Sequence, residues 1–277
     1  MKKINICIAG LGTVGSNVVL SLNKNNDYIT SKANLFFNIL GVSAKNKSKK
    51  RKCDINNFTW YEDPLDLLSI KDCNVLIELI GEEKGLSFDL VKKALEKKIH
   101  VVTANKALLA MNGSELFKIA EENNVLLLYE AAVAGGIPII KSIKNSIYLN
   151  KINKVSGILN GTTNYILTEM EKFNLDFHEV LKKAQSNGYA EADPINDIEG
   201  FDSAHKLTLL STLCFGSKIN FKNNKFSGIN NIHIEDIHNA KKLGYRIKLI
   251  SESQIIEGKI MNVTEPRMIK ITNPLAK

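Results

Sequence analysis

Residues 4–15 read Ile-Asn-Ile-Cys-Ile-Ala-Gly-Leu-Gly-Thr-Val-Gly, an apolar run that ends in a glycine-rich turn. Residues 14–22 then place apolar side chains at helical spacing, so this part of the chain predicts a strand, a tight turn and a helix. Glycines at this spacing permit the turn and let a pyrophosphate approach bare backbone, while the helix N-terminus supplies amide donors. We interpret residues 10–15 as a dinucleotide-binding turn; the alternative is a glycine-rich turn without a ligand.

The rest of the first half alternates between short apolar runs and helical patterns. Strands are expected at residues 35–42, 74–80, 100–103 and 125–129, and helices at residues 86–97 and 113–123. Strands separated by helices predict an α/β fold in which a doubly wound parallel sheet carries helices on both faces.

The choice of dinucleotide depends on the residues that follow the second expected strand. An NAD-specific enzyme usually has Asp or Glu there to hold the ribose 2′-hydroxyl, but this chain reads Ser43-Ala-Lys-Asn-Lys47. Small residues followed by lysines leave room for a 2′-phosphate and attract it. We therefore favour NADP, with Ala44 and Lys45 beside the phosphate, and keep NAD as the alternative.

A segment rich in carboxylates, residues 188–206, stands out in a chain that is otherwise basic. Asp202 and Lys206 are four residues apart within an expected helix at residues 201–215, so both side chains should project from one face. One reading is an exposed ion pair of little energetic value. We favour the other, in which an acid and a base face a cavity that receives a small cationic ligand.

Composition excludes several other classes of protein. The 277 residues carry 37 basic and 29 acidic side chains, a net charge of +8. Much of that excess lies in one run, residues 45–52, with no pattern typical of nucleic-acid binding, so no nucleic-acid partner is expected. The four cysteines lack metal-ligand spacing and predict reduced thiols. No apolar stretch is long enough to cross a membrane, and we expect a cytoplasmic protein.

Four segments of the chain, taken with the carboxylate-rich one, together resemble homoserine dehydrogenase; they are residues 10–15, 102–106, 129–138 and 156–166. The resemblance implies an NAD(P)-dependent oxidoreductase that transfers hydride reversibly between L-homoserine and L-aspartate 4-semialdehyde, a step of threonine, methionine and isoleucine synthesis. It also implies a homodimer. The expected domains are an NAD(P)-binding Rossmann domain at residues 1–133 and an α+β catalytic and dimerisation domain at residues 134–277.

The resemblance also assigns roles to particular residues. Lys206 resembles the proton-transfer lysine of the family, and Lys106 resembles a second catalytic lysine beside the nicotinamide. The substrate-binding residues it implies are Glu191, Asp202, Gly188 and Asp197. The implied cofactor-binding residues are Gly10, Leu11, Gly12, Thr13, Val14, Gly15, Ala44, Lys45, Thr103, Lys106 and Gly188.

Residues 130–137 resemble the monovalent-cation loop of the family, in which the Glu130 side chain joins the backbone carbonyls of Val133, Gly135 and Ile137. Ligation by oxygen alone suits a hard cation such as Na⁺. The alternative is a glycine hinge between the domains. Further along, we expect Asn160 to line the cleft and a threonine hydroxyl of residues 161–163 to cap the next helix.

One departure from the family concerns the end of the sequence. Chains of this family normally continue into a returning segment that covers the nicotinamide, whereas this sequence stops at Lys277. We expect a C-terminally truncated form, and the alternative function is a non-catalytic remnant that still binds nucleotide. A phosphorylating semialdehyde dehydrogenase would need a cysteine nucleophile in mid-chain, and none lies between Cys73 and Cys214.

Overall fold

The computed structural model describes residues 1–147 and 149–277. These residues form two compact units, Met1–Ile137 and Pro138–Lys277. The units divide after Ile137, in a loop that follows the last strand of the first sheet, whereas the domain boundary predicted from the sequence lies at residue 133.

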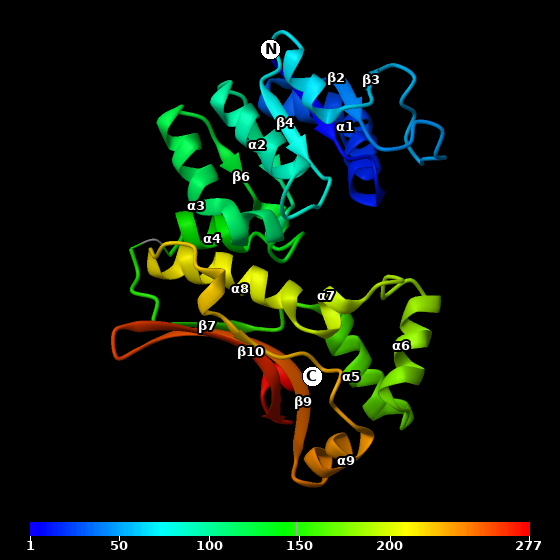
Figure 1. Ribbon diagram of the computed structural model, residues 1–277, viewed down its shortest axis with the longest axis vertical. Coiled ribbons are helices and arrows are strands. Elements are labelled where there is room, and N and C mark those ends of the chain that lie inside the picture. Colours follow the sequence, from blue (N-terminus) through cyan, green and yellow to red (C-terminus); the bar gives the residue numbers. More distant parts are fainter. Residues whose placement is uncertain (148) are drawn as a thin grey trace. The chain divides into compact units, whose positions relative to one another are not determined.

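The first unit is built on a six-stranded sheet in the order β3-β2-β1-β4-β5-β6, and every pair of neighbours is parallel (Figure 1). Its strands are β1 (Lys2–Ala9), β2 (Leu35–Ser43), β3 (Thr59–Tyr61), β4 (Val75–Glu78), β5 (His100–Thr103) and β6 (Leu127–Leu128). This order is that of a Rossmann fold, so the predicted doubly wound sheet is confirmed. The strand order reverses between β1 and β4, and ligands of such sheets bind beside the carboxyl ends of the strands at that point.

The helices of the first unit are α1 (Thr13–Ala33), α2 (Leu86–Glu96) and α3 (Lys106–Glu122), with short 3-10 turns at η1 (Pro64–Ser69) and η2 (Glu130–Ala132). The predicted start of the third helix at residue 113 was wrong, because α3 begins seven residues earlier. The Asn105 side chain accepts a hydrogen bond from the Leu108 amide at 3.0 Å and caps the helix there. Apolar side chains of β1, β2 and α1 form one core cluster of this unit, among them Ile6, Ile8, Val19 and Val42.

The second unit contains a mixed four-stranded sheet in the order β7-β9-β10-β8. Its strands are β7 (Lys154–Gly157), β8 (Lys225–Phe226), β9 (Tyr245–Ile256) and β10 (Lys259–Lys270). The long strands β9 and β10 form an antiparallel hairpin, and the turn at Glu257 and Gly258 has positive φ at both residues. The predicted α+β character of this half of the chain is therefore confirmed.

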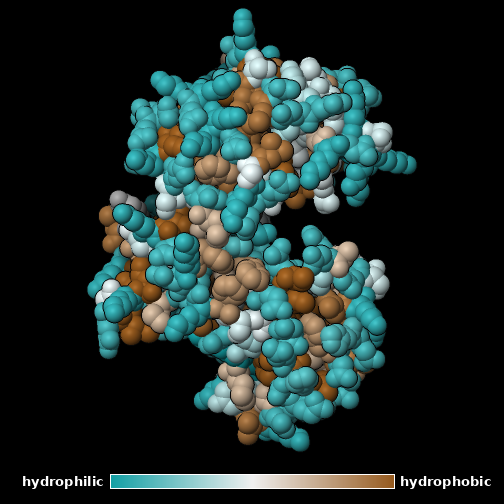
Figure 2. All heavy atoms as spheres, viewed as in Figure 1, coloured by the Kyte–Doolittle hydropathy of each residue, from teal (hydrophilic) through white to brown (hydrophobic). Residues whose placement is uncertain are grey.

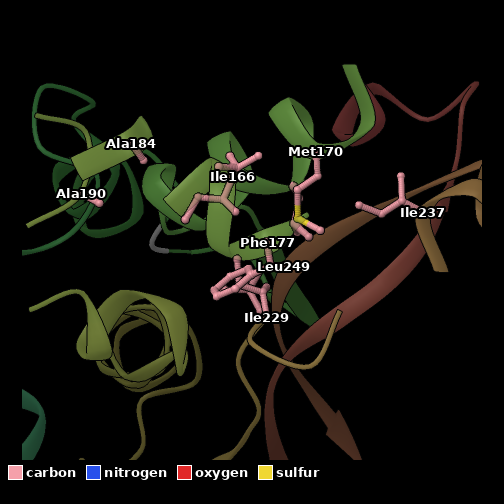
Figure 3. Close-up of a cluster of buried hydrophobic side chains, with 10 residues drawn as sticks. Ile166, Met170, Phe177, Ala184, Ala190, Ile229, Ile237 and Leu249 are labelled. Atoms are coloured by element: carbon pink, nitrogen blue, oxygen red, sulfur yellow. The ribbon is translucent and has the colours of Figure 1, made fainter. Parts of the chain in front are cut away.

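Helices cover this sheet and supply its core (Figure 1). They are α4 (Ile139–Asn145), α5 (Gly161–Phe173), α6 (Phe177–Ser186), α7 (Ile195–Ile198), α8 (Phe201–Phe215) and α9 (Ile234–Lys242), with 3-10 turns at η3 (Phe221–Asn223) and η4 (Pro274–Ala276). Helix α8 has the predicted bounds. Figure 3 shows a cluster of buried hydrophobic side chains, in which Ile166 and Met170 of α5 meet side chains of α6, α9 and β9. This packing fixes α5, whose N-terminus carries part of the site described below.

Hydrophilic residues predominate on the face of the molecule shown in Figure 2, with smaller apolar patches between them. Among the described residues, no helix is both long and apolar enough to span a lipid bilayer. All four cysteines are free thiols, as predicted, and Cys7 and Cys53 are buried.

Candidate functional site

The glycine turn after β1 has a backbone that only glycine accommodates at two positions. Gly10 has a φ of +100°, and a Cβ at this residue would lie 2.4 Å from the carbonyl oxygen of Leu79. A Cβ at Gly15 would lie 1.9 Å from the carbonyl oxygen of Gly10, so α1 packs directly against the turn. Gly12, by contrast, faces open space, and no side chain of the described residues caps the start of α1. The first amides of α1, at Thr13 and Val14, therefore suit an anionic ligand such as a pyrophosphate.

A cavity of about 430 Å³ lies beside this turn at the carboxyl ends of β1, β2 and β4. Its walls include the predicted residues Gly10, Leu11, Gly12, Ala44 and Lys45. Ser43 also lines it, and the buried Ser43 hydroxyl has no hydrogen-bond partner among the described residues. The free amides at the start of α1 and the open space at Gly12 adjoin this cavity, an arrangement that fits the phosphates of a nucleotide. The residues present thus fit a dinucleotide.

Arg51 holds the loop between β2 and β3 against the glycine turn. Its Nε donates to the Leu11 carbonyl at 3.2 Å, and its other nitrogens donate to the carbonyls of Asn46, Lys47 and Lys49 at 2.5–3.2 Å. The guanidinium also lies 5.3 Å from the centre of the Trp60 ring. No sequence motif predicted this role for Arg51; the only indication is that it is the one arginine in a run of lysines at residues 45–52.

Two other predicted cofactor-binding residues follow β5. Thr103 is buried, and its hydroxyl donates to Glu78 at 2.6 Å while it accepts from the Asn105 amide at 2.9 Å. Lys106 is the first residue of α3 and is half-buried. Both residues therefore lie at the carboxyl end of the parallel sheet, the edge at which such folds bind ligands.

In the second unit, Asp202 and Lys206 form a close ion pair on one face of α8, as their spacing predicted. The Lys206 ammonium lies 2.6 Å from the Asp202 carboxylate and also donates to the Leu159 carbonyl at 2.8 Å. The Lys206 side chain is only 19% exposed and that of Asp202 only 7%, so the alternative of an exposed helix ion pair is wrong. Burial strengthens the attraction between the two charges and fixes the position of the ammonium.

Asn160 connects this pair to a second acid. Its amide nitrogen donates to Asp197 at 2.7 Å and to Asp202 at 2.8 Å. Its amide oxygen accepts from the Thr163 amide at 2.8 Å and so caps α5. The predicted threonine cap was wrong, because the Thr163 hydroxyl instead approaches the same Asn160 oxygen at 3.0 Å. One buried amide thus brings Asp197, Asp202 and Lys206 together.

The remaining predicted substrate residues lie on the loop between α6 and α7. Gly188 has a φ of +76° and is exposed, and Glu191 is exposed as well. Gln185 holds the loop by donating from its side chain to the Glu191 carbonyl at 3.1 Å. No described contact joins the Glu191 carboxylate to the pair of Asp202 and Lys206. His205, which precedes Lys206 on α8, is buried and packs against the Phe221 ring.

The predicted cation loop lies at the end of the first unit. Glu130 begins η2, Val133 is buried, and Gly135 and Ile137 are exposed. The backbone turns sharply here, with positive φ at Ala134 and Gly136. Burial, followed by the neighbouring Glu130 carboxylate, raises the pKa of Tyr129. A donor set of one carboxylate and three carbonyls offers only oxygen, which fits a hard cation.

Two family models match the chain: the homoserine dehydrogenase model covers residues 138–277, and the NAD-binding domain of homoserine dehydrogenase covers residues 10–130. The homoserine dehydrogenase of Neisseria gonorrhoeae is 44% identical over 90% of this chain. Among solved structures, the homoserine dehydrogenase of Thiobacillus denitrificans matches the whole chain with a TM-score of 0.94 and 38% identity. That of S. aureus matches the whole chain with a TM-score of 0.85 and 40% identity.

The matched proteins differ from this chain in length. The chain spans 57% of the N. gonorrhoeae protein, 64% of the T. denitrificans chain and 69% of the S. aureus chain.

Proposed function

This chain belongs to the homoserine dehydrogenase family, and on that basis we propose that it catalyses reversible hydride transfer between L-homoserine and L-aspartate 4-semialdehyde. The observation that carries the proposal is the buried pair of Asp202 and Lys206, held by Asn160. The alternative, a non-catalytic remnant that binds nucleotide, is not favoured, because the family model extends over the unit that contains this pair.

The side chains of the second unit would handle the proton and the charge of the substrate. In the reducing direction, the Lys206 ammonium polarises the aldehyde oxygen and donates a proton to it; in the oxidising direction, Lys206 Nζ accepts the hydroxyl proton. Asp202 and the Leu159 carbonyl fix the position of Nζ. The carboxylates of Glu191, Asp197 and Asp202, with the backbone of Gly188, would bind the substrate ammonium and hydroxyl. The nicotinamide, when bound, supplies or accepts the hydride.

Replacing Lys206 tests this function most directly. Lys206→Met keeps the length of the side chain but removes its proton, so we expect kcat to fall about 100-fold to 10,000-fold, with little change in the Kd for NADPH. Reduction of aspartate semialdehyde, followed by loss of NADPH absorbance, measures kcat, and cofactor fluorescence measures Kd. The matched control is Lys242→Met at an exposed position of α9. Turnover in Lys206→Met equal to that of the control would refute the role of Lys206.

We further propose that NADP is preferred over NAD. The support is the absence of an acid directly after β2 and the presence of Lys45, Lys49 and Arg51 around the cavity. Two carboxylates, Glu62 and Glu82, also line it, and Glu82 lies 3.3 Å from Lys45, so NAD is the alternative.

Ala44→Asp tests the preference for NADP. The new carboxylate would repel a 2′-phosphate and accept a hydrogen bond from a free ribose hydroxyl. We expect the ratio of Kd for NADPH to Kd for NADH to rise by about tenfold or more, an electrostatic change of about 1.4 kcal/mol. Ala44→Ser, which adds no charge, is the control. Tighter binding of NADH than of NADPH by the unaltered chain would contradict the proposal.

We also propose a Na⁺ site formed by Glu130 and the carbonyls of Val133, Gly135 and Ile137, and a homodimer as the assembled form. The oxygen donors and sharp turn of residues 130–137 support the Na⁺ site. The homodimer is proposed from the family resemblance.

A further inference from the structure

Glu78, the last residue of β4, carries a fully buried carboxylate that the sequence analysis did not single out. Its Oε1 accepts from the amides of Ile80 and Gly81, at 2.9 and 3.3 Å, and from the Ser87 hydroxyl at 3.1 Å. Its Oε2 accepts from the Thr103 hydroxyl at 2.6 Å. No basic side chain among the described residues forms an ion pair with Glu78. Hydrogen-bond donors alone therefore offset the cost of burying this carboxyl group.

These donors come from three different elements. Ile80 and Gly81 belong to the loop after β4, Ser87 lies in the first turn of α2, and Thr103 ends β5. Leu79, Ile80 and Glu82 of the first loop line the cavity of about 430 Å³. Glu78 thus ties a wall of the cofactor cavity to the neighbouring strand.

The network continues from Thr103 to the start of α3. The Thr103 hydroxyl accepts from the Asn105 amide at 2.9 Å, and the Asn105 side chain donates to the Glu82 carbonyl at 2.7 Å. The same side chain caps α3 through the Leu108 amide. Lys106 is the next residue of the chain. An unbroken series of hydrogen bonds therefore runs from Glu78 to the backbone that carries Lys106.

We propose that Glu78 is a positioning residue for the cofactor: its carboxylate holds the loops after β4 and β5 in the arrangement that shapes the dinucleotide cavity and places Lys106. This inference rests on the proposed function, because Lys106 and the cavity take their roles from it. Glu78 lies at the carboxyl end of the strand beside β1, where the strand order reverses. A carboxylate at that point can accept from both loops at once, whereas an apolar residue could join neither.

Glu78→Gln is the informative substitution. If the glutamine oxygen keeps the amides of Ile80 and Gly81, its NH₂ group replaces Oε2 opposite Thr103. The Thr103 hydroxyl must then accept from that NH₂ group, and its own proton loses the acceptor. The charge-assisted link to the second loop therefore becomes a weaker neutral one, while the first link is retained. Thr103→Val removes the hydroxyl that bonds Glu78 and so breaks this link, with little change in side-chain volume. Thr103→Ser keeps the hydroxyl.

The test measures the Kd for NADPH by cofactor fluorescence, kcat with aspartate semialdehyde, and thermal unfolding of each variant. We expect Glu78→Gln and Thr103→Val to weaken NADPH binding about tenfold and to lower kcat at saturating cofactor about tenfold or more, with Thr103→Ser recovering most of both losses. The control is Ser253→Ala, which removes a buried hydroxyl of the second unit that bonds Ser211 and Asn262. It should lower the unfolding midpoint and leave the Kd at its original value.

If Glu78 had only a structural role, its replacement would lower the unfolding midpoint without changing the Kd for NADPH or kcat. Kd and kcat within twofold of the unaltered chain, in folded Glu78→Gln and Thr103→Val, would overturn the proposal. If Glu78→Gln does not fold, Ser87→Ala supplies the comparison, because it removes another donor to Glu78 Oε1 at a residue with no assigned role in cofactor binding. The Kd for NADPH can be measured without turnover. A chain that binds NADPH but does not reduce aspartate semialdehyde would therefore refute the proposed function, while the Kd values of the variants would still test the role of Glu78.

Discussion

Asn160 is the residue on which the arrangement of the second unit's acids depends, because one amide group serves two carboxylates and a helix start. Asn160→Asp would keep the oxygen that caps α5, remove both N–H donors and add a third carboxylate beside Asp197 and Asp202. We expect activity to fall about tenfold or more, since the Asp202 carboxylate that positions Lys206 would lose a partner and gain a repelling neighbour. Initial rates at several homoserine concentrations measure this.

The same variant should also be less stable than the parent chain. Three neighbouring carboxylates repel one another, so we expect Asn160→Asp to lower the midpoint of urea unfolding at pH 7. The control is Asn273→Asp, which alters the exposed cap of η4. An equal loss of stability in both variants would contradict the expected repulsion.

The position of Lys206 beside Asp202 could be predicted from the sequence, whereas the position of Asn160 beside Asp202 could not. Asp202 and Lys206 share one helix, so a spacing of four and an apolar periodicity suffice to place them on one face. Asn160 and Asp202 are separated by 42 positions and meet only because α5 and α8 pack in one unit. No local sequence pattern predicts this long-range contact. The hydrogen bond from Arg51 to the Leu11 carbonyl, 40 residues away, could not be predicted for the same reason.

At the scale of elements, Glu252 of β9 joins three strands of the second sheet. It lies 2.5 Å from Lys154 of β7 and 3.1 Å from Arg267 of β10. Burial alone would raise the pKa of Glu252, but its hydrogen bonds to Lys154 and Arg267 outweigh that effect, and the pKa is lowered. The folded state therefore favours the carboxylate more than the unfolded state does, and the ion pairs stabilise the sheet above the usual pKa of a glutamic acid.

Glu252→Gln should remove this stabilisation, with a loss of about 1–3 kcal/mol in the free energy of unfolding near pH 7. As the pH falls through the lowered pKa, Glu252 is protonated in both states and the difference between variant and parent should disappear. Urea unfolding at pH values from 7 to 3 measures this difference. Glu265→Gln is the control, because Glu265 also pairs with Arg267 but its side chain is 45% exposed. A loss in Glu252→Gln that persists undiminished at pH 3 would argue against the ion pairs.

The elements that the sequence predicted well are those with a clear period and clear ends. Strand β5 and helix α8 have the predicted bounds because apolar runs and glycines delimit them. The start of α3 was missed because Gly113 resembles a breaker, whereas it is buried inside the helix, and the cap at Asn105 decides the boundary. Strand β3 has only three residues and takes its conformation from pairing with β2, so no local pattern identified it.

At the scale of the whole molecule, the change of pattern along the sequence marks the two units. Alternating strands and helices give way to the long hairpin of β9 and β10, and the two family models match residues 10–130 and 138–277. The parallel sheet could be predicted because its connections are helical. The pairing of β8 with β10 could not, since two residues beside a long strand leave no periodic signal.

The single tryptophan offers a way to follow one unit alone. Trp60 lies in β3 of the first unit, beside Arg51, while the second unit has none. A ligand that binds only the folded state at 100 times its Kd adds about 2.7 kcal/mol of stability. We therefore expect saturating NADP⁺ to raise the midpoint of the Trp60 fluorescence transition by roughly 5–10 °C. NADP⁺ is chosen over NADPH because the oxidised form does not absorb the tryptophan emission.

The control for this measurement is sodium chloride at matched ionic strength, since a chain with a net charge of +8 responds to salt as well. NAD⁺ at the same concentration should produce a smaller shift if the lysines of residues 45–49 bind the 2′-phosphate. If NADP⁺ and sodium chloride raise the midpoint of the Trp60 fluorescence transition equally, the response is an effect of ionic strength. That outcome would contradict a dinucleotide-binding site in the first unit. A shift specific to NADP⁺ would support the site without any measurement of catalysis, because it depends only on binding to the folded state.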